Sequence, residues 1–161
     1  MNDFSKTAAA RLAFEDFTPG LSFPLGPKTV TAEEIVAFAE QFDPQPMHLD
    51  AEAGATSLLG GLAASGWHSC AMMMRMMYDS WLANSTSQGS PGITSNRWKR
   101  PVLEGDVLSG SSTVLTARRL RSRPQIGLVE FRHVLANQRG ETVLETENPI
   151  MFRLREQGTQ S

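Results

Sequence analysis

A long, mostly apolar segment in the middle of the chain constrains the fold more than any other feature. Residues 66–83 read GWHSCAMMMRMMYDSWLA, with no proline and no glycine after the first position. This predicts a helix of about four to five turns. Apolar side chains lie nearly all round it, and five of them are methionines between Met72 and Met77. Such a helix has to be buried on most sides, so we expect the rest of the chain to wrap around it.

Four segments after this helix have the character of strands. Each is bounded by glycine, proline or polar turn residues. They cover residues 93–100, 106–118, 125–137 and 141–155. The sequence NQRG at residues 137–140 predicts a hairpin between the last two. A further short strand is expected near residues 21–23, ended by Pro24, Gly26 and Pro27.

The order of these elements predicts an α+β fold, in which an antiparallel sheet wraps one long central helix as a single domain. A sheet of roughly five or six strands leaves open edges, so we expect a homodimer or a higher homo-oligomer. We place the domain at residues 14–155, between a flexible leader (residues 1–13) and a flexible tail (residues 156–161).

A second helix is predicted from Thr31 to Phe42. Thr31, followed three residues later by Glu34, has the sequence of a capping box. Apolar side chains then recur at helical spacing at Ile35, Phe38, Ala39 and Phe42. A short helix over residues 51–58 should follow, ended by two successive glycines.

Composition and charge argue against several classes of function. The net charge of -2 gives no indication of binding to nucleic acid or to a membrane. One cysteine, Cys70, excludes an intramolecular disulfide framework and a multi-cysteine metal site. The three histidines, at positions 48, 68 and 133, lack metal-site spacing, so we predict no metal and no separate cofactor. With no apolar targeting or spanning segment in the sequence, a cytoplasmic protein is expected.

The segment DPQPMHLD at residues 43–50 is the most informative about chemistry. It places a carboxylate, Asp43, and an imidazole, His48, five residues apart on a rigid, irregular connection stiffened by Pro44 and Pro46. A histidine titrates near neutral pH, and a carboxylate beside it can fix its tautomer or share a water with it. The alternative is that Asp43 caps a turn and His48 lies in a surface loop.

Several short motifs occur along the chain in a fixed order. The first, D-x-x-P-x-H-x-D, follows the helix that ends in Phe42 and is formed by Asp43, Pro46, His48 and Asp50. The others are Ser65-Gly66, Arg100-Pro101-Val102 with Gly105-Asp106, and Asn137-Gln138 with Gly140. In these motifs the chain resembles the MaoC-like family of hot-dog dehydratases, which includes the (R)-specific enoyl-CoA hydratases. The resemblance covers roughly residues 14–154.

The resemblance implies a hot-dog fold and the addition or removal of water across the Cα–Cβ bond of an acyl-CoA thioester. Asp43 and His48 would together handle the water. The N–H of Gly66, at the start of the central helix, would hold the thioester oxygen as charge develops on it. The alternative for Gly66 is an ordinary glycine at a helix start. Substrate-binding residues are expected at Pro46, Ser65, His68, Met74, Arg121 and Arg123.

Some of these positions have other interpretations. His68 is close enough to Gly66 in sequence to line the pocket, or it is an ordinary helix histidine. Met74 stands where some family members have a serine near the aspartate, which makes the pocket more apolar, and Gln45 replaces the usual asparagine. The loop with Arg121 and Arg123 would bind the phosphates of coenzyme A, across a dimer, or is a solvated surface.

Two other functions stay open at this point. Hot-dog folds also host thioesterases, which tend to carry their carboxylate on the central helix; Asp79, near the end of that helix, is its only acidic residue. The third candidate is a non-catalytic module that binds acyl-CoA or lipid, and Met74 in place of a polar residue is the feature that favours it.

Overall fold

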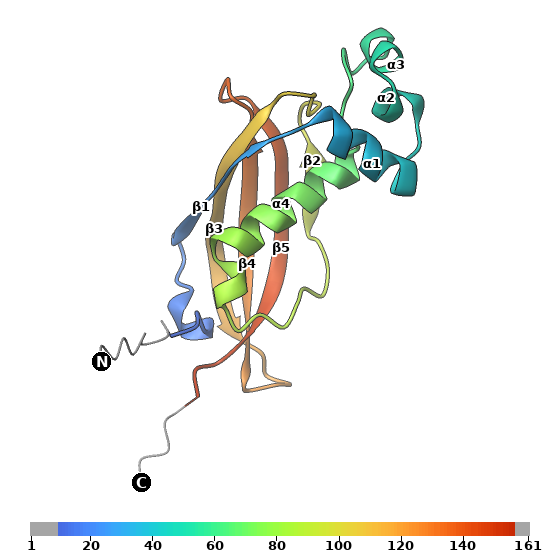
Figure 1. The fold of residues 1–161 in the computed structure, drawn as a ribbon. Helices are drawn as coiled ribbons and strands as arrows, with labels where there is room; N and C mark the ends of the chain where they lie inside the picture. The colour runs from blue at the N-terminus through green and yellow to red at the C-terminus, as the bar shows by residue number, and fades with distance from the viewer. Residues whose placement is uncertain (1–9, 157–161) are drawn as a thin grey trace, which may run out of the picture.

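The computed structural model describes residues 10–156 and shows a five-stranded antiparallel sheet curved around one long helix (Figure 1). The strands are β1 (Ser22–Thr29), β2 (Ser95–Trp98), β3 (Val107–Arg119), β4 (Ile126–Ala136) and β5 (Thr142–Arg153), and they lie in the order β1-β3-β4-β5-β2. The helix, α4 (Gly66–Ser80), lies across the concave face of the sheet. The predicted α+β hot-dog architecture is confirmed.

One face of α4 forms the centre of the hydrophobic core. Its buried side chains pack against large apolar side chains of the sheet, among them Phe131, Leu135 and Phe152, and the buried face of the helix comprises His68, Ser69, Met72, Met73, Met76 and Met77. Removing this much apolar surface from water is the main term that holds helix and sheet together.

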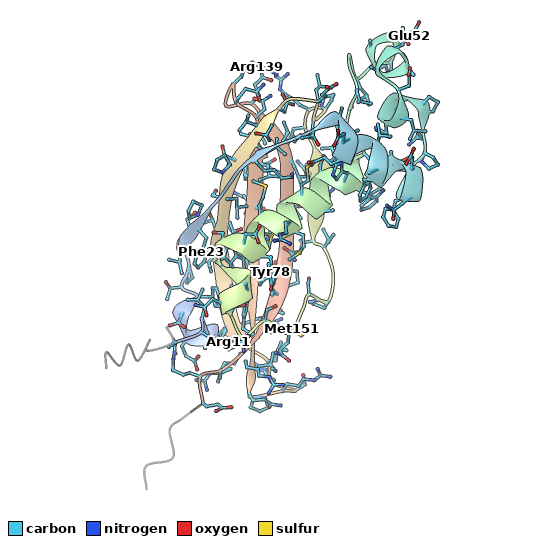
Figure 2. The ribbon with its side chains drawn as sticks, in the orientation of Figure 1. Arg11, Phe23, Glu52, Tyr78, Arg139 and Met151 are labelled. Carbon is cyan, nitrogen blue, oxygen red and sulfur yellow. The ribbon has the colours of Figure 1, made fainter. Side chains whose placement is uncertain are left out.

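The other face of α4 is open in the single chain. Trp67, Met74 and Tyr78 are 60%, 46% and 51% exposed, and Tyr78 stands on the outer side of the helix in Figure 2. The prediction that the helix is buried on most sides is therefore wrong for one chain. A sheet of five strands curves far enough to cover one face of a helix and leaves the opposite face uncovered.

Three shorter helices lie together next to the N-terminal end of α4: α1 (Ala32–Phe42), α2 (Pro46–Leu49) and α3 (Ala51–Thr56) (Figure 1). The predicted N-cap is confirmed, because the Thr31 side chain accepts a hydrogen bond from the Glu34 amide. The irregular connection predicted for residues 43–50 is wrong in part. Pro46 occupies the first turn of α2, where its fixed φ and missing N–H favour a helix start.

The strand segments agree with the sequence except at β1. Pro24, Gly26 and Pro27 were expected to end this strand, yet it continues to Thr29. β1 is an edge strand, which tolerates a residue without an N–H donor, and a register shift between Leu25 and Lys28 accommodates the rest. The predicted hairpin between β4 and β5 is present, and Asn137 Oδ1 accepts hydrogen bonds from two amides within it.

Part of the expected leader belongs to the folded unit. The Leu12 amide donates to the carbonyl of Asn84, the Thr86 amide donates to the carbonyl of Leu12, and Ala13 is buried. Residues 1–9 of the predicted leader and residues 157–161 of the predicted tail lie outside the described residues. Within residues 10–156 no helix has the length and apolarity to cross a membrane.

A close contact between two backbones fixes the segment that leads into α4. A Cβ atom added at Gly54, in α3, would lie 2.3 Å from the carbonyl oxygen of Gly61. No side chain fits in this space, so glycine allows α3 to pack directly on the chain just before α4.

We predict that Gly54→Ala lowers the free energy of unfolding by about 1–3 kcal/mol, because the added methyl group forces these backbones apart. In a helix without this contact, alanine would instead be favoured over glycine. Urea unfolding measures the change, and Gly92→Ala is the control because nothing lies within 4 Å of its added Cβ. Equal stability of Gly54→Ala and wild type would contradict the packing argument.

Candidate active site

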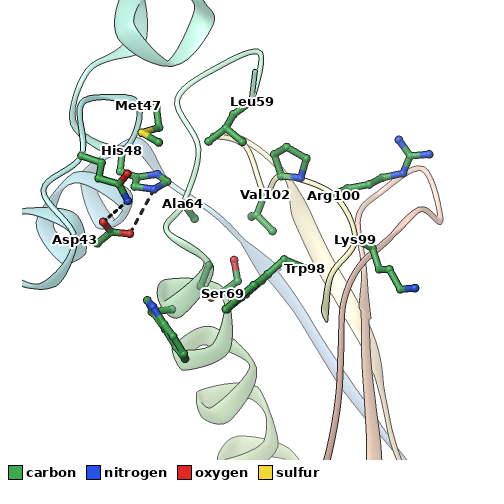
Figure 3. A pocket seen from close by; sticks show the side chains of 14 residues that line it. Asp43, Met47, His48, Leu59, Ala64, Ser69, Trp98, Lys99, Arg100 and Val102 are labelled. Atoms are coloured by element: carbon green, nitrogen blue, oxygen red, sulfur yellow. Dashed lines mark hydrogen bonds and ion pairs between the residues drawn. The ribbon is translucent and has the colours of Figure 1, made fainter. Parts of the chain in front are cut away.

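A pocket of about 400 Å³ lies at the N-terminal end of α4 (Figure 3). It is formed where α2, the chain entering α4 and the segment after β2 meet. Asp43, His48 and Gly66 line it from one side, and Trp98 with residues 99–102 lines it from the other. The structure thus brings together the two side chains and the glycine that the sequence singled out.

Asp43 is held in place by both its backbone and its side chain. It is the C-cap of α1, and its amide donates to the carbonyl of Ala39. Its Oδ2 accepts a hydrogen bond from Ser65 Oγ at 2.6 Å, and its Oδ1 accepts one from Gln45 Nε2 at 2.7 Å. The Ser65 bond, followed by the Gln45 bond, lowers the pKa of Asp43, while partial burial opposes the shift. The carboxylate is therefore ionised at neutral pH.

His48 is a buried residue of α2, and its ring has a fixed hydrogen-bonding partner. Only 5% of the residue is exposed, so the alternative of a surface-loop histidine is wrong. Nδ1 lies 2.7 Å from the carbonyl oxygen of Ala63. Because a carbonyl oxygen can only accept, Nδ1 carries a proton, and in the neutral ring Nε2 has the free lone pair. This assignment of the tautomer follows from the partner of Nδ1.

The free nitrogen of His48 faces the Asp43 carboxylate. Nε2 lies 3.5 Å from Asp43 Oδ2, and Figure 3 shows the two side chains pointing toward each other. A carboxylate oxygen and an imidazole lone pair are both acceptors, so one water can donate a hydrogen to each of them. The arrangement is suited to hold a water by both hydrogens, with its oxygen lone pairs directed away from the pair.

Gly66 begins α4 at the edge of the same pocket. As the first residue of the helix it has an amide with no intrahelical acceptor, and the helix dipole favours negative charge there. The indole of Trp98 lies directly against it. A Cβ at position 66 would be 2.6 Å from Trp98 Cε2, and Trp98 Nε1 donates to the Gly66 carbonyl at 2.9 Å. Glycine at this position therefore allows the close packing of the indole.

The other predicted substrate-binding residues near the site have distinct positions. Pro46 starts the helix that carries His48, and Ser65 is a buried donor to Asp43. His68 is outside the pocket, where its ring stacks on Phe38 at 4.8 Å with Nε2 3.7 Å from a carboxylate oxygen of Glu34. Burial lowers the pKa of His68, and the carboxylate of Glu34 opposes this shift. The stacking on Phe38 makes His68 part of the packing of α1 against α4.

Three predicted residues are not brought to this pocket within one chain. Met74 is two turns further along α4 and lines a second cavity. Arg121 and Arg123 are exposed in the loop between β3 and β4, at the end of the sheet away from α1, α2 and α3 (Figure 1). The physical reason is the length of β3, whose thirteen residues run from the pocket end of the molecule to the other end. Figure 2 marks the two ends, with Arg139 and Glu52 at one and Arg11 and Met151 at the other.

Four further residues line the pocket without having been predicted from the sequence: Trp98, Ser69, Lys99 and Arg100. The motif that runs from Arg100 to Asp106 could have identified the basic pair. Asp106 accepts a hydrogen bond from the Leu103 amide, and this bond forms a turn. The turn holds the segment with Lys99 and Arg100 beside the chain that enters α4. No comparable sequence signal identified Trp98.

No group of three or more His, Cys, Asp or Glu side chains that could hold a metal ion occurs in the part of the chain that the structure describes. His133 is buried in β4, with Nδ1 2.8 Å from Ser112 Oγ and Nε2 2.9 Å from Asn148 Oδ1. Burial lowers its pKa to about 4, so this ring is neutral in the core.

Comparison with known proteins supplies the family. The model of the MaoC like domain matches residues 18–145. The chain is similar to the MaoC-like dehydratase from Rhodospirillum rubrum, at 38% identity over 91% of this chain and 99% of that one, with a TM-score of 0.81.

Two further solved structures show the fold. One is the R-hydratase PhaJ1 from Pseudomonas aeruginosa, at 23% identity over 90% of this chain and 88% of that one, with a TM-score of 0.73. The other is Rv0216 from Mycobacterium tuberculosis, which has a double hot-dog fold; identity is 19% over 96% of this chain and 48% of that one, with a TM-score of 0.77.

We predict that Ser65→Ala raises the pKa of Asp43 toward its ordinary value, because it removes the bond that lowers this pKa most. The folded-state pKa of Asp43 lies below the unfolded value of about 4, so this group stabilises the fold above that pH. The contribution is lost as the pH falls through the folded-state pKa. The advantage of wild type over Ser65→Ala should therefore shrink in acid.

Carboxyl carbon NMR of Asp43 measures the pKa, and urea unfolding over a pH series measures the stability. Ser69→Ala is the matched control, since this buried hydroxyl donates to the Ser65 carbonyl, whereas the side-chain hydrogen bonds of Asp43 come from Ser65 and Gln45. If the Asp43 titration were the same in Ser65→Ala and wild type, Ser65 would not be its principal donor.

Proposed function

This chain belongs to the MaoC-like domain family, and we propose that it interconverts an enoyl-CoA and a 3-hydroxyacyl-CoA by adding or removing water. The observation that carries the proposal is the distance of 3.5 Å between His48 Nε2 and Asp43 Oδ2, with the free lone pair of the imidazole facing an ionised carboxylate in an open pocket. The family model and the similarity to a MaoC-like dehydratase support the same class of reaction.

In the proposed hydration, Asp43 and His48 hold one water by its two hydrogens. Its oxygen forms a bond to C3 of the enoyl group while one proton passes to the Asp43–His48 pair. A proton is returned from the pair to C2, so both residues end in the state in which they began. Negative charge develops on the thioester oxygen during this step, and the Gly66 N–H is the group proposed to bind it.

The chain offers less support for thioester hydrolysis by a carboxylate on the central helix. Asp79 is the acidic residue of α4, and its Oδ2 accepts a hydrogen bond from Arg75 Nε at 2.9 Å on the exposed face of the helix. It does not line the pocket that contains His48. Hydration through Asp43 is therefore the reaction that the site favours.

We propose further that the protein works as a homodimer or a larger homo-oligomer, with coenzyme A as part of the substrate and no separate cofactor. β2 is an edge strand of four residues, and Trp67 and Met74 expose apolar surface on the neighbouring face of α4. An open sheet edge beside uncovered apolar side chains is typical of a surface that a second copy covers.

Lys99 and Arg100 are the cations proposed to bind the phosphates of coenzyme A. Both line the pocket, and both are on its exposed rim, where they form ion pairs with Glu145 and Glu141. Exposed ion pairs of this kind contribute little to stability, so these cations can exchange carboxylate partners for phosphate at low cost.

We predict that His48→Ala and Asp43→Asn each lower the hydration rate of crotonyl-CoA by about 10²- to 10⁴-fold. The first removes the imidazole that accepts a hydrogen from the water, and the second replaces the carboxylate with a neutral amide that cannot take up a proton. Loss of enoyl absorbance measures the rate, and release of free thiol in the same samples detects hydrolysis. Asp79→Asn, an exposed carboxylate outside the pocket, is the matched control and should keep the wild-type rate. Variants as active as wild type, or thiol release in place of hydration, would refute the proposed reaction.

We predict that Lys99→Ala and Arg100→Ala raise KM for crotonyl-CoA several-fold with little change in kcat, because they weaken binding of the phosphates and leave the water site intact. The effect should decrease as salt is added. The matched comparison is the crotonyl thioester of N-acetylcysteamine, which has no phosphate and should show no change. Arg121→Ala tests the loop that the sequence suggested, and a larger effect there would assign phosphate binding to that loop.

A further inference from the structure

A second cavity lies along the same side of α4 as the candidate active site. Its volume is about 300 Å³, and it is formed between α4, β5 and the chain that connects α4 to β2. Apolar side chains dominate its lining, including Met73, Met74, Met77, Ile93 and Ile150. A cavity of this composition favours an aliphatic group over water.

The two cavities follow one another along the seam between α4 and β2. Residues 96 and 98 of β2 are two positions apart and point to the same face of the strand. Trp98 contacts Gly66 and lines the active-site pocket, whereas Asn96 contacts Cys70, one helical turn later, and lines the second cavity. The boundary between the cavities is therefore at the level of Trp98.

The indole of Trp98 lies at this boundary, with 46% of the residue exposed. It lies against the Cα of Gly66, its Nε1 is bonded to the Gly66 carbonyl, and it packs edge-to-face with Trp67 at 5.3 Å between ring centroids. Cys70 follows one helical turn after Gly66, and its thiol donates to Asn96 Oδ1. Burial raises the pKa of the Cys70 thiol, and hydrogen bonds with the Trp98 and Asn96 side chains act in the opposite direction.

We infer that Trp98 is the residue that sets acyl-chain length, because its indole closes the passage from the active-site pocket into the apolar cavity and restricts the enzyme to short acyl chains. The inference rests on the proposed function and specifies its substrate class. Trp98 is a specificity-determining residue in this scheme and takes no part in the proton transfers.

The geometry explains why the ring acts on chain length. A thioester whose oxygen is at the Gly66 amide has its acyl carbons beside the start of α4, where the indole lies. A short chain ends within the first pocket. A longer chain has to continue along the seam, and the indole occupies the space beside Gly66 through which it would pass.

The test is the chain-length profile of Trp98→Ala and Trp98→Leu. We expect the ratio of kcat/KM for trans-2-octenoyl-CoA to that for crotonyl-CoA to rise at least about tenfold over wild type, because the removed ring joins the apolar cavity to the site. Trp98→Phe is the matched control. It removes the hydrogen bond to Gly66 but keeps an aromatic ring, so its profile should stay near that of wild type.

A second substitution tests whether a longer acyl chain lies in the apolar cavity. Met74 lines the apolar cavity, and Met74→Trp in the Trp98→Ala background fills it from the rim. This double variant should return the ratio of octenoyl to crotonyl activity toward the wild-type value. If it kept the full gain, the chain would run elsewhere and the inference would be overturned.

Binding of saturated thioesters separates this inference from the proposed reaction. Calorimetry with butyryl-CoA and octanoyl-CoA needs no turnover, and the Trp98→Ala preference should shift toward octanoyl-CoA by a similar factor. Wild type that binds butyryl-CoA but hydrates no enoyl-CoA would refute the proposed reaction alone. The role of Trp98 alone would be refuted by a different result. In that case wild type hydrates crotonyl-CoA, and the folded Trp98→Ala and Trp98→Leu variants keep the wild-type chain-length profile and binding preference.

Discussion

The hydrogen bond from Ser65 to Asp43 is the interaction on which the candidate site depends. It joins the residue before α4 to the residue after α1, so it connects the helix that the sheet fixes to the helices that carry the catalytic candidates. Ser65 is fully buried, and a hydrogen bond from a hydroxyl to a carboxylate in such a place is both short and directional. The position of Asp43 relative to the core is set by this bond, and the position of His48 relative to Asp43 follows from the short chain between them.

Three fixed contacts prepare the site before any ligand binds. Ser65 and Gln45 keep the carboxylate of Asp43 ionised and oriented, and the Ala63 carbonyl fixes the tautomer of His48. Ser65 and His48 are buried and Asp43 caps the end of α1, so these groups have already lost much of their freedom, whereas Gln45 is exposed. A site built in this way needs little rearrangement to act on a bound molecule, which is the usual physical basis of efficient catalysis.

The sequence predicted the elements well where local chemistry decides them. Thr31 caps α1, and the glycine-containing turn at residues 137–140 joins two strands. It failed where neighbours override local preference. Pro24 interrupts nothing because its strand lies at the sheet edge, and Pro46 starts a helix where an irregular connection was expected.

In the candidate site, too, local sequence predicts some features and the fold decides others. The family resemblance points to position 74, where Met74 replaces a serine near the aspartate. The hydroxyl that donates to Asp43 belongs instead to Ser65, nine residues earlier and about 13 Å away along the helix axis. The basic residues of the Arg121 loop also suggest phosphate binding. Only the direction of β3 shows that this loop lies far from the pocket in one chain.

Local sequence is enough to place the apolar central helix, the strands that pack on one of its faces and the spacing of Asp43 and His48, because these follow from periodicity, capping and proline. Only folding of the whole chain brings together the groups that meet across it: Ser65 with Asp43, Ala63 with His48, and Trp98 with Gly66. The members of these pairs are 22, 15 and 32 residues apart in the chain. Local propensity contains no information about such distances, since packing of the whole core fixes them.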